Sequence, residues 1–165
     1  LSRGLGDVYK RQDSDSVNVL TRIFNHKFFT VYDYIIIDCQ PSLDLLVSNA
    51  LSCCDKLLIP VQADLLAYEG VNQMLQTLQR IKKRTDIGDF MLGILPTMYA
   101  KNTVISNEIL QALKESYTDY VLQPAISYRV EVKNSSATRT SLVNHKNSYV
   151  GEEYMRIVYE IIART

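Results

Sequence analysis

The chain has 165 residues, 47% of them hydrophobic, and its 18 Lys and Arg balance its 18 Asp and Glu. This composition excludes collagen-like, low-complexity and strongly disordered classes, and no apolar run approaches the eighteen or so residues of a membrane span. Zero net charge gives no global attraction to nucleic acid or to a membrane. The three cysteines, two of them adjacent, do not suit a disulfide framework, so a cytoplasmic protein is predicted.

The N-terminal third combines an irregular leader with a helix and a strand. Residues 1–12 show no periodicity and are interpreted as a non-native or disordered leader, which leaves residues 13–165 as the folded part. Apolar residues at helical spacing predict a short helix within 17–29. The β-branched run that ends at Asp38 predicts a central parallel strand over 32–38, buried on both faces.

Helices and strands alternate in the middle of the chain. Helical spacing over 43–50, with Ser42 as N-cap, is followed by a strand over 56–61. Residues 71–81 carry the clearest amphipathic helical pattern of the chain, and 90–95 reads as a third strand.

The last third contains weaker signals. Ser106 is predicted to cap a helix, with Ile105 and Leu110 as a hydrophobic staple, and 120–122 is a weak fourth strand. A final amphipathic helix runs to the C-terminus. Strands that alternate with helices predict an α/β fold, a parallel β-sheet with helices on both faces. Ligands bind beyond the carboxyl ends of such strands, which are here marked by Asp38, Gln62 and Thr97.

A carboxylate directly after a buried strand suits one particular metal role. Asp38 occupies the place of a Walker B residue, which holds Mg²⁺ through water beside nucleotide phosphates. The same pattern also fits a turn former or a helix cap, so Asp38 alone leaves both interpretations open.

Several short motifs occur together in a fixed order. They are Tyr32–Leu43, Asn49–Leu51, Ile59–Gln62, Glu69–Gly70 and Leu95–Tyr99. This ordered set resembles the ParA/Soj family of partitioning ATPases, P-loop NTPases with a deviant Walker A motif. The resemblance implies an ATP- and Mg²⁺-dependent homodimer that binds DNA nonspecifically and is released by a ParB-like centromere-binding protein. It also implies a cytoplasmic, nucleoid-associated protein of plasmid or chromosome partitioning, without a membrane partner.

The resemblance assigns roles to individual residues. Asp38 matches the Walker B carboxylate, Pro41 the proline at the following helix entry, and Gln62 a glutamine near the nucleotide and the dimer face. The segments matched to the neighbourhood of the base contribute Thr97, Met98, Ser127, Tyr128, Arg129 and Val130.

The chain also departs from the family pattern. Gln40 replaces a second proline, and Asn102 stands beside Lys101 where the family has a DNA-binding arginine. No GxxxxGK[ST] pattern occurs, and only 37 residues precede Asp38. We therefore expect a C-terminal portion of a ParA-like, P-loop NTPase-like domain with its N-terminal part truncated. Such a chain is expected neither to bind ATP tightly nor to hydrolyse it, although the full-length parent would.

Two alternatives remain, one from a different functional class and one from the same superfamily. The chain could be a non-catalytic remnant or interaction module without nucleotide binding. It could also be a MinD-like membrane-cycling ATPase, but its last helix carries three carboxylates against two arginines, which does not favour anionic membranes.

A polar segment over 121–148 holds four cations against one anion. Such a segment binds phosphate backbones or is simply a solvated loop. The DNA-binding candidates are Lys101, Arg129, Lys133, Arg139 and Lys146.

Overall fold

The computed structural model describes residues 18–40, 45–81 and 90–165, which form two compact units, 1–55 and 56–165. The predicted leader 1–12, the candidate site residue Pro41 and the predicted cap Ser42 lie outside the described residues. The longest described helix has 17 residues, and no described helix is both long and apolar enough to cross a membrane.

The first unit contains α2 (Val19–Phe24), the 3-10 helix η1 (Lys27–Val31) and α3 (Leu45–Cys53). Buried Asn49 connects two of them, because its Oδ1 accepts a hydrogen bond from the Val19 backbone N–H at 2.9 Å. Its Nδ2 donates to the Leu45 carbonyl at 3.0 Å. Asn49 thereby satisfies a backbone donor at the start of α2 that no helical carbonyl can reach.

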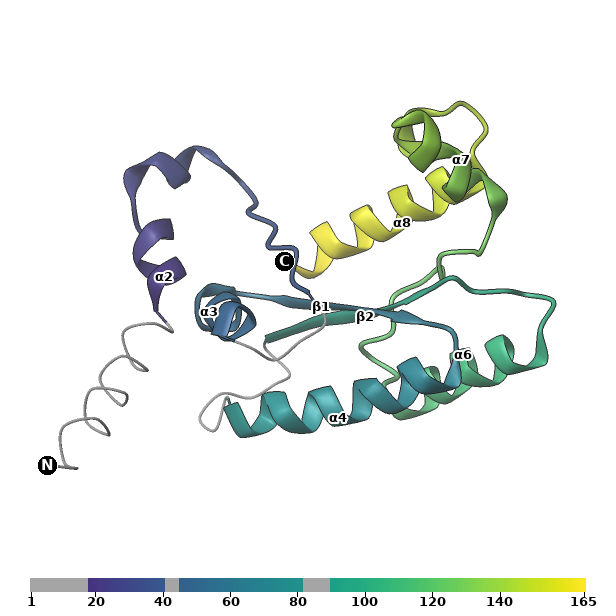
Figure 1. The fold of residues 1–165 in the computed structure, drawn as a ribbon, viewed down its shortest axis with the longest axis horizontal. Coiled ribbons are helices and arrows are strands. Elements are labelled where there is room, and N and C mark those ends of the chain that lie inside the picture. Colours follow the sequence, from purple (N-terminus) through teal and green to yellow (C-terminus); the bar gives the residue numbers. More distant parts are fainter. Residues whose placement is uncertain (1–17, 41–44, 82–89) are drawn as a thin grey trace, which may run out of the picture. The chain divides into compact units, whose positions relative to one another are not determined.

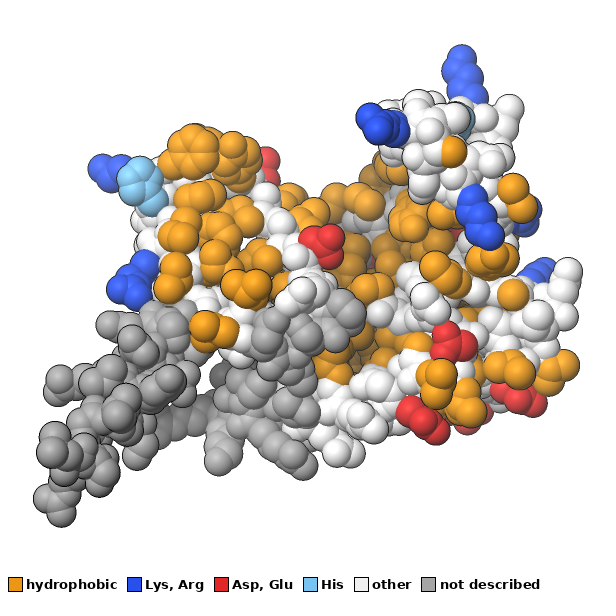
Figure 2. Space-filling model, in the orientation of Figure 1, with side chains coloured by type: hydrophobic (Ala, Val, Ile, Leu, Met, Phe, Trp, Pro, Cys, Tyr) orange, Lys and Arg blue, Asp and Glu red, His pale blue; other side chains and the backbone are white. Residues whose placement is uncertain are grey.

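The strand predicted over 32–38 is wrong. Residues 32–40 form neither helix nor strand, and the Ile36 side chain is 91% exposed instead of buried. A strand exists only when its backbone groups pair with a neighbour, and no described segment pairs with this one. Figure 2 shows exposed hydrophobic side chains gathered over α2 and η1. Phe28 and Val31 are among the exposed hydrophobic residues of η1.

The second unit is built around two parallel strands, β1 (Leu57–Gln62) and β2 (Met91–Thr97), as the sequence predicted. The weak fourth strand is reduced to a single parallel bridge between Ile94 and Val121. In it, the Ile94 N–H donates to the Tyr120 carbonyl at 2.7 Å, and the Leu122 N–H donates to the Ile94 carbonyl at 2.9 Å.

Helices cover both faces of this sheet, which confirms the predicted α/β architecture. Figure 1 shows α4 (Leu65–Ile81) and α6 (Val104–Ser116) on one face and α8 (Tyr149–Arg164) on the other. The stripe predicted for α4 lies inward, with Val71, Leu75 and Leu78 buried. On the α8 face, a core cluster joins strand and helix through Leu95, Leu122, Ile126, Val150 and Ile157. The shorter α7 (Val130–Thr138) and η2 (Leu142–Asn144) precede α8.

Ser106 does not cap α6, so that prediction is wrong. The helix begins at Val104, and Ser106 is a buried residue inside its first turn. Its Oγ donates to the Ala63 carbonyl at 3.1 Å and accepts from the Ala100 N–H at 3.1 Å. The hydroxyl therefore joins the two loops that follow β1 and β2, a tertiary role that local spacing does not predict.

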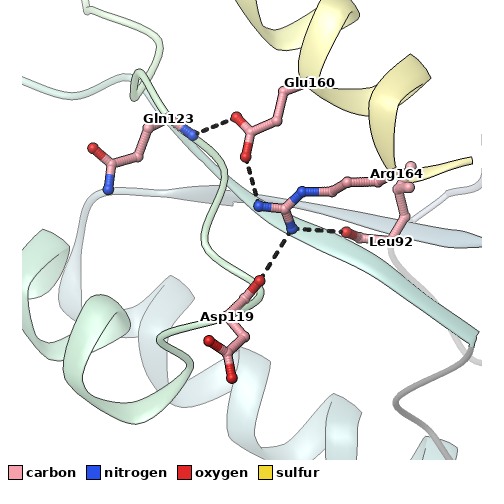
Figure 3. A network of polar contacts seen from close by, with 5 residues as sticks. All are labelled: Leu92, Asp119, Gln123, Glu160 and Arg164. Atoms are coloured by element: carbon pink, nitrogen blue, oxygen red, sulfur yellow. Dashed lines mark hydrogen bonds and ion pairs between the residues drawn. The ribbon is translucent and has the colours of Figure 1, made fainter.

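Arg164 fixes the C-terminal end of α8 (Figure 3). Its guanidinium donates to the carbonyls of Leu92 at 3.1 Å and Asp119 at 3.2 Å, and it pairs with Glu160 at 2.5 Å. Glu160 also accepts from the Gln123 N–H at 3.0 Å. One side chain thus joins the helix to β2 and to the loop after α6.

Candidate functional site

Three of the predicted site residues lie at the carboxyl ends of the paired strands. Gln62 ends β1 and Thr97 ends β2, and the register places them opposite each other. The Thr97 hydroxyl donates to the Val61 carbonyl at 3.2 Å, and the Ala63 N–H donates to the Thr97 carbonyl at 3.0 Å. Met98 follows directly. This is the edge at which ligands bind in open parallel sheets.

The second predicted segment, 127–130, lies beside the first. The Tyr99 N–H donates to the Ile126 carbonyl at 2.9 Å, and the Tyr128 N–H donates to the Tyr99 carbonyl at 2.9 Å. Segments that are about thirty residues apart in the sequence are therefore joined by a parallel bridge between Tyr99 and Ser127. We call Gln62, Thr97, Met98, Ser127, Tyr128 and Arg129 the carboxyl-edge surface.

Met98 has an unusual backbone conformation. Its φ is +50°, in the left-handed region that residues with a Cβ rarely adopt, and its side chain is exposed. Strained backbone of this kind concentrates at ligand sites, where the surrounding structure maintains it. Here the Thr97 and Tyr99 backbone bonds hold both flanks of the residue.

A buried carboxylate from α8 supports this surface, and sequence reasoning missed it. Glu153 is only 6% exposed, and its two oxygens accept from the Ser127 N–H at 2.8 Å and from the Ser127 hydroxyl at 2.6 Å. In the sequence, Glu153 is one of several charged residues on an amphipathic helix, so no local signal distinguishes it.

A second carboxylate, on α7, accepts hydrogen bonds from the start of α8. Glu131, in the first turn of α7, accepts from the Ser148 hydroxyl at 3.0 Å and from the Val150 N–H at 3.1 Å. Ser148 caps α8 by accepting from the Gly151 N–H at 2.9 Å. Glu131 therefore holds the start of α7 against the start of α8. Glu153 holds α8 against Ser127, in the segment that precedes α7.

The predicted cations are exposed, and four of the five lie on or near α7. Figure 2 shows Lys and Arg side chains around this end of the second unit. The Arg129 guanidinium lies 4.3 Å from the centroid of the Tyr149 ring, and the Lys133 ammonium lies 5.6 Å from that of Tyr128. Arg139 follows as the C-cap of α7, whereas Lys101 lies in the turn before α6.

Asp38 belongs to the first unit and is exposed, in the irregular segment 32–40. The described ranges contain no group of three His, Cys, Asp or Glu side chains that could hold a metal ion. A single carboxylate is a weak Mg²⁺ ligand unless phosphate oxygens complete the coordination. The described residues therefore do not by themselves fit Mg²⁺ with a triphosphate.

Cys53, the last residue of α3, gives no sign of nucleophilic chemistry. Burial raises the pKa of Cys53, while Asp55 and Cys39 add smaller contributions in the same direction and a backbone hydrogen bond opposes them. The thiol form is thereby favoured, and the thiolate is the reactive species.

Comparisons with known proteins identify relatives of this chain. The family described as "AAA domain" matches residues 9–88. The sporulation initiation inhibitor protein Soj of Bacillus subtilis is 33% identical over 133 residues, which cover 80% of this chain and 53% of Soj. The chromosome partitioning protein ParA of Caulobacter vibrioides is 26% identical over 134 residues, 81% of this chain and 50% of that protein. The chain thus spans about half the length of these curated relatives.

Solved structures give the same class. A Borrelia burgdorferi B31 protein assigned to plasmid partition, bound to AMPPNP, superimposes with a TM-score of 0.69 at 25% identity, covering 90% of this chain and 55% of that one. Cobyrinic acid a,c-diamide synthase of Mycobacterium smegmatis, with an ATP analogue and magnesium, gives 0.59 at 34% identity, covering 68% and 46%. Fold and site together define a P-loop NTPase-like α/β domain. Within that class, the chain belongs to the ParA/Soj family of partitioning ATPases.

Proposed function

We propose that the chain is the part of a partition ATPase that carries the Walker B carboxylate, the base side of the nucleotide site and the nonspecific DNA-binding surface. In this proposal ATP and Mg²⁺ bind only when a P-loop segment is also present, and nucleotide binding drives homodimerisation. Hydrolysis, stimulated by a ParB-like partner, then releases the DNA. The protein acts in the cytoplasm on the nucleoid.

The observation that carries the base-side assignment is the bridge between Tyr99 and Ser127. It assembles Thr97, Met98, Ser127 and Tyr128 at the carboxyl edge of the sheet, where ligands of open α/β folds bind. The exposed Tyr128 ring and Met98 side chain offer apolar surface to a planar base. The nucleotide analogues bound by the two structural neighbours support the same assignment.

The DNA-binding part of the proposal depends on the exposed cations around α7. Arg129, Lys133, Arg139 and Lys146 are exposed, as is Lys101 before α6. Cations of this kind neutralise backbone phosphates without reading the sequence. The polar helix α7 buries no residue completely, which leaves its surface free for such contacts.

The test of the ATPase assignment is a chimera in which the upstream P-loop segment of Bacillus subtilis Soj precedes residues 13–165. We expect the chimera to hydrolyse ATP, and we expect Asp38→Ala to reduce kcat by at least about a hundredfold, because the metal loses its protein carboxylate. The matched control is Asp33→Ala, which removes an exposed carboxylate from the same segment. Phosphate release, measured with and without DNA, gives the rates.

A chimera that folds and binds DNA but hydrolyses no ATP would contradict the ATPase assignment. Equal loss in the Asp38 and Asp33 variants would contradict the specific role of Asp38. In the first case the non-catalytic interaction module becomes the better description.

A further inference from the structure

The sheet of the second unit has one edge at which no described segment pairs. β2 lies between β1 and the bridged segment 120–122, so β1 ends the sheet. The Ala63 N–H donates to the Thr97 carbonyl of β2 at 3.0 Å. Because backbone groups alternate in direction along a strand, those of Leu58, Pro60 and Gln62 face the free edge. Proline has no N–H, so the donors at this edge come from the other two residues.

One flank of α8 is apolar and exposed. Tyr154, Val158 and Ile162 follow one another at intervals of four residues, which places them on one face of the helix. Their side chains are between 36% and 49% exposed, whereas Val150 and Ile157 of the same helix are buried against the sheet. We call the three exposed residues the α8 flank.

The polar contacts of α8 show which way this flank is turned. Glu153, Glu160 and Arg164 all bond to the segment 119–127, which lies beside β2 on the side away from β1. Around the helix, Ile157, which packs into the core, lies between these polar residues and the α8 flank. The α8 flank is therefore turned toward the free edge of β1, and the two form one apolar surface with unpaired backbone groups.

The chain contains a segment whose chemistry fits this surface. The run Tyr34–Ile37 is apolar at every position, and no described strand or bridge includes it. The Ile36 side chain is 91% exposed. A run of this kind suits a strand that is covered on both faces. A strand beside β1 would be covered by the α8 flank on one face and by α4, which packs against β1, on the other.

We propose that two copies of the chain associate by exchanging the run Tyr34–Ile37. Each run adds as a further strand to the β1 edge of the other copy and packs against its α8 flank. Exchange of identical segments gives two identical contacts about a two-fold axis.

The area of such an exchange suits a stable dimer. Each contact covers the Tyr34 ring, about 150–250 Å². It also covers the three isoleucines that follow and the α8 flank of the accepting copy. Two such contacts reach the roughly 1,200–2,000 Å² of a specific interface.

This association goes beyond the proposed function, because it involves neither a nucleotide nor a P-loop segment. The homodimer of the proposed function forms only when nucleotide binds, whereas the exchanged dimer forms in its absence. The two are therefore distinguished by the conditions under which each is measured.

The first test is sedimentation equilibrium of the 165-residue chain without nucleotide, over a range of micromolar concentrations. We expect a reversible monomer–dimer equilibrium. Ile36→Asp is expected to weaken dimerisation at least about a hundredfold, because the exchanged strand would bury an unpaired charge. Val31→Asp is the matched control, since Val31 is 74% exposed in the same unit but lies outside the run, and it should leave the dissociation constant unchanged.

The accepting surface is tested on α8. Val158→Asp is expected to weaken dimerisation at least about tenfold, since it places a charge on the α8 flank. Tyr159→Asp is its control, because Tyr159 is exposed on the same helix outside the flank. Hydrogen exchange tests the strand pairing itself. The Leu58 amide should be protected at concentrations where the dimer predominates, and Ile36→Asp should abolish this protection.

Three results would overturn the proposal. They are a chain that stays monomeric over the whole range, association that continues beyond a dimer, and a dimer that neither Ile36→Asp nor Val158→Asp weakens. A monomer with a protected Leu58 amide would place the run on the β1 edge of its own chain, which also excludes the exchange. The nucleotide assignments are tested separately by the chimera, so their failure and the failure of this proposal are distinguishable.

Discussion

Arg139 adopts a left-handed backbone conformation, which the Cβ of its side chain disfavours. It is the C-cap of α7, with φ of +54° and ψ of +36°, and its N–H donates to the Ser136 carbonyl at 3.4 Å. Glycine is the usual residue at such a helix end because it has no Cβ to oppose the conformation. An arginine there is consistent with a requirement for its charge on the basic surface around α7.

Replacing Arg139 therefore gives effects of opposite sign on stability and on DNA binding. Arg139→Gly is expected to increase the free energy of unfolding by about 1 kcal/mol, because the left-handed strain is relieved. The same variant is expected to bind duplex DNA more weakly. The decrease of log affinity with log salt concentration is expected to become less steep by about 0.9. Urea unfolding and fluorescence anisotropy at several salt concentrations measure the two effects.

Arg139→Ala is the control for this prediction. It removes the charge and keeps a Cβ, so DNA affinity should fall as for glycine while stability does not increase. Unchanged DNA affinity in both variants would exclude Arg139 from the DNA surface.

At the scale of single residues, the sequence predicted the members of the carboxyl-edge surface better than the contacts that hold them. Gln62 and Thr97 end strands with clear hydrophobic patterns and Met98 follows directly, so their place at one edge could be predicted. Glu153 lies 26 residues from the serine that it binds, and Ser106 lies 43 from Ala63. Such pairings depend on tertiary packing, which local sequence patterns do not predict.

Among the elements, the close approach of the segment 120–122 to β2 depends on Gly93. A Cβ at this position would lie 2.9 Å from Leu122 Cγ and 2.9 Å from the Tyr120 carbonyl oxygen. Both contacts are closer than side chains tolerate, and the carbonyl belongs to the backbone that forms the bridge to Ile94. The bridge between Ile94 and Val121 therefore requires a residue without a side chain at position 93.

Gly93→Ala is accordingly expected to destabilise the second unit by about 1–3 kcal/mol, through overpacking against Leu122 and Tyr120. Gly70→Ala is the matched control. Gly70 lies within α4 with nothing within 4 Å of the added Cβ, so this variant should gain about 0.5–1 kcal/mol from helix propensity. Thermal and urea unfolding measure both changes. Equal effects from the two substitutions would contradict the packing described for Gly93.

The elements that could be predicted from the sequence are those whose partners lie nearby in the second unit. The strands β1 and β2 pair with each other, and α4, which lies between them in the sequence, covers one face. Each of these predicted elements therefore packs against another one that is close in the sequence. Residues 32–38 have an equally strong β-branched pattern and form no strand. A hydrophobic, β-branched run indicates that a segment is suited to a buried strand. The strand forms only beside a neighbour with which its backbone can pair.

At the scale of the whole molecule, the residues assigned to the proposed nucleotide site belong to different units, each described by itself. Asp38 belongs to the first unit, and the carboxyl-edge surface belongs to the second. The sequence contains no phosphate-binding GxxxxGK[ST] pattern, and successive backbone N–H groups of such a loop are what holds a triphosphate. The proposed base side therefore stands in a sequence without this phosphate-binding pattern.

The central claim is that this chain recognises the base of a nucleotide and not its phosphates. The most direct measurement is a pair of titrations of the ¹⁵N-labelled chain, one with adenosine and one with ATP and Mg²⁺. The account predicts that both shift the signals of Met98 and Tyr128, with dissociation constants that agree within about threefold, because the phosphates add no contacts. Micromolar binding of ATP, about a hundredfold or more tighter than adenosine, would contradict it, since such a difference requires a phosphate-binding site in this chain.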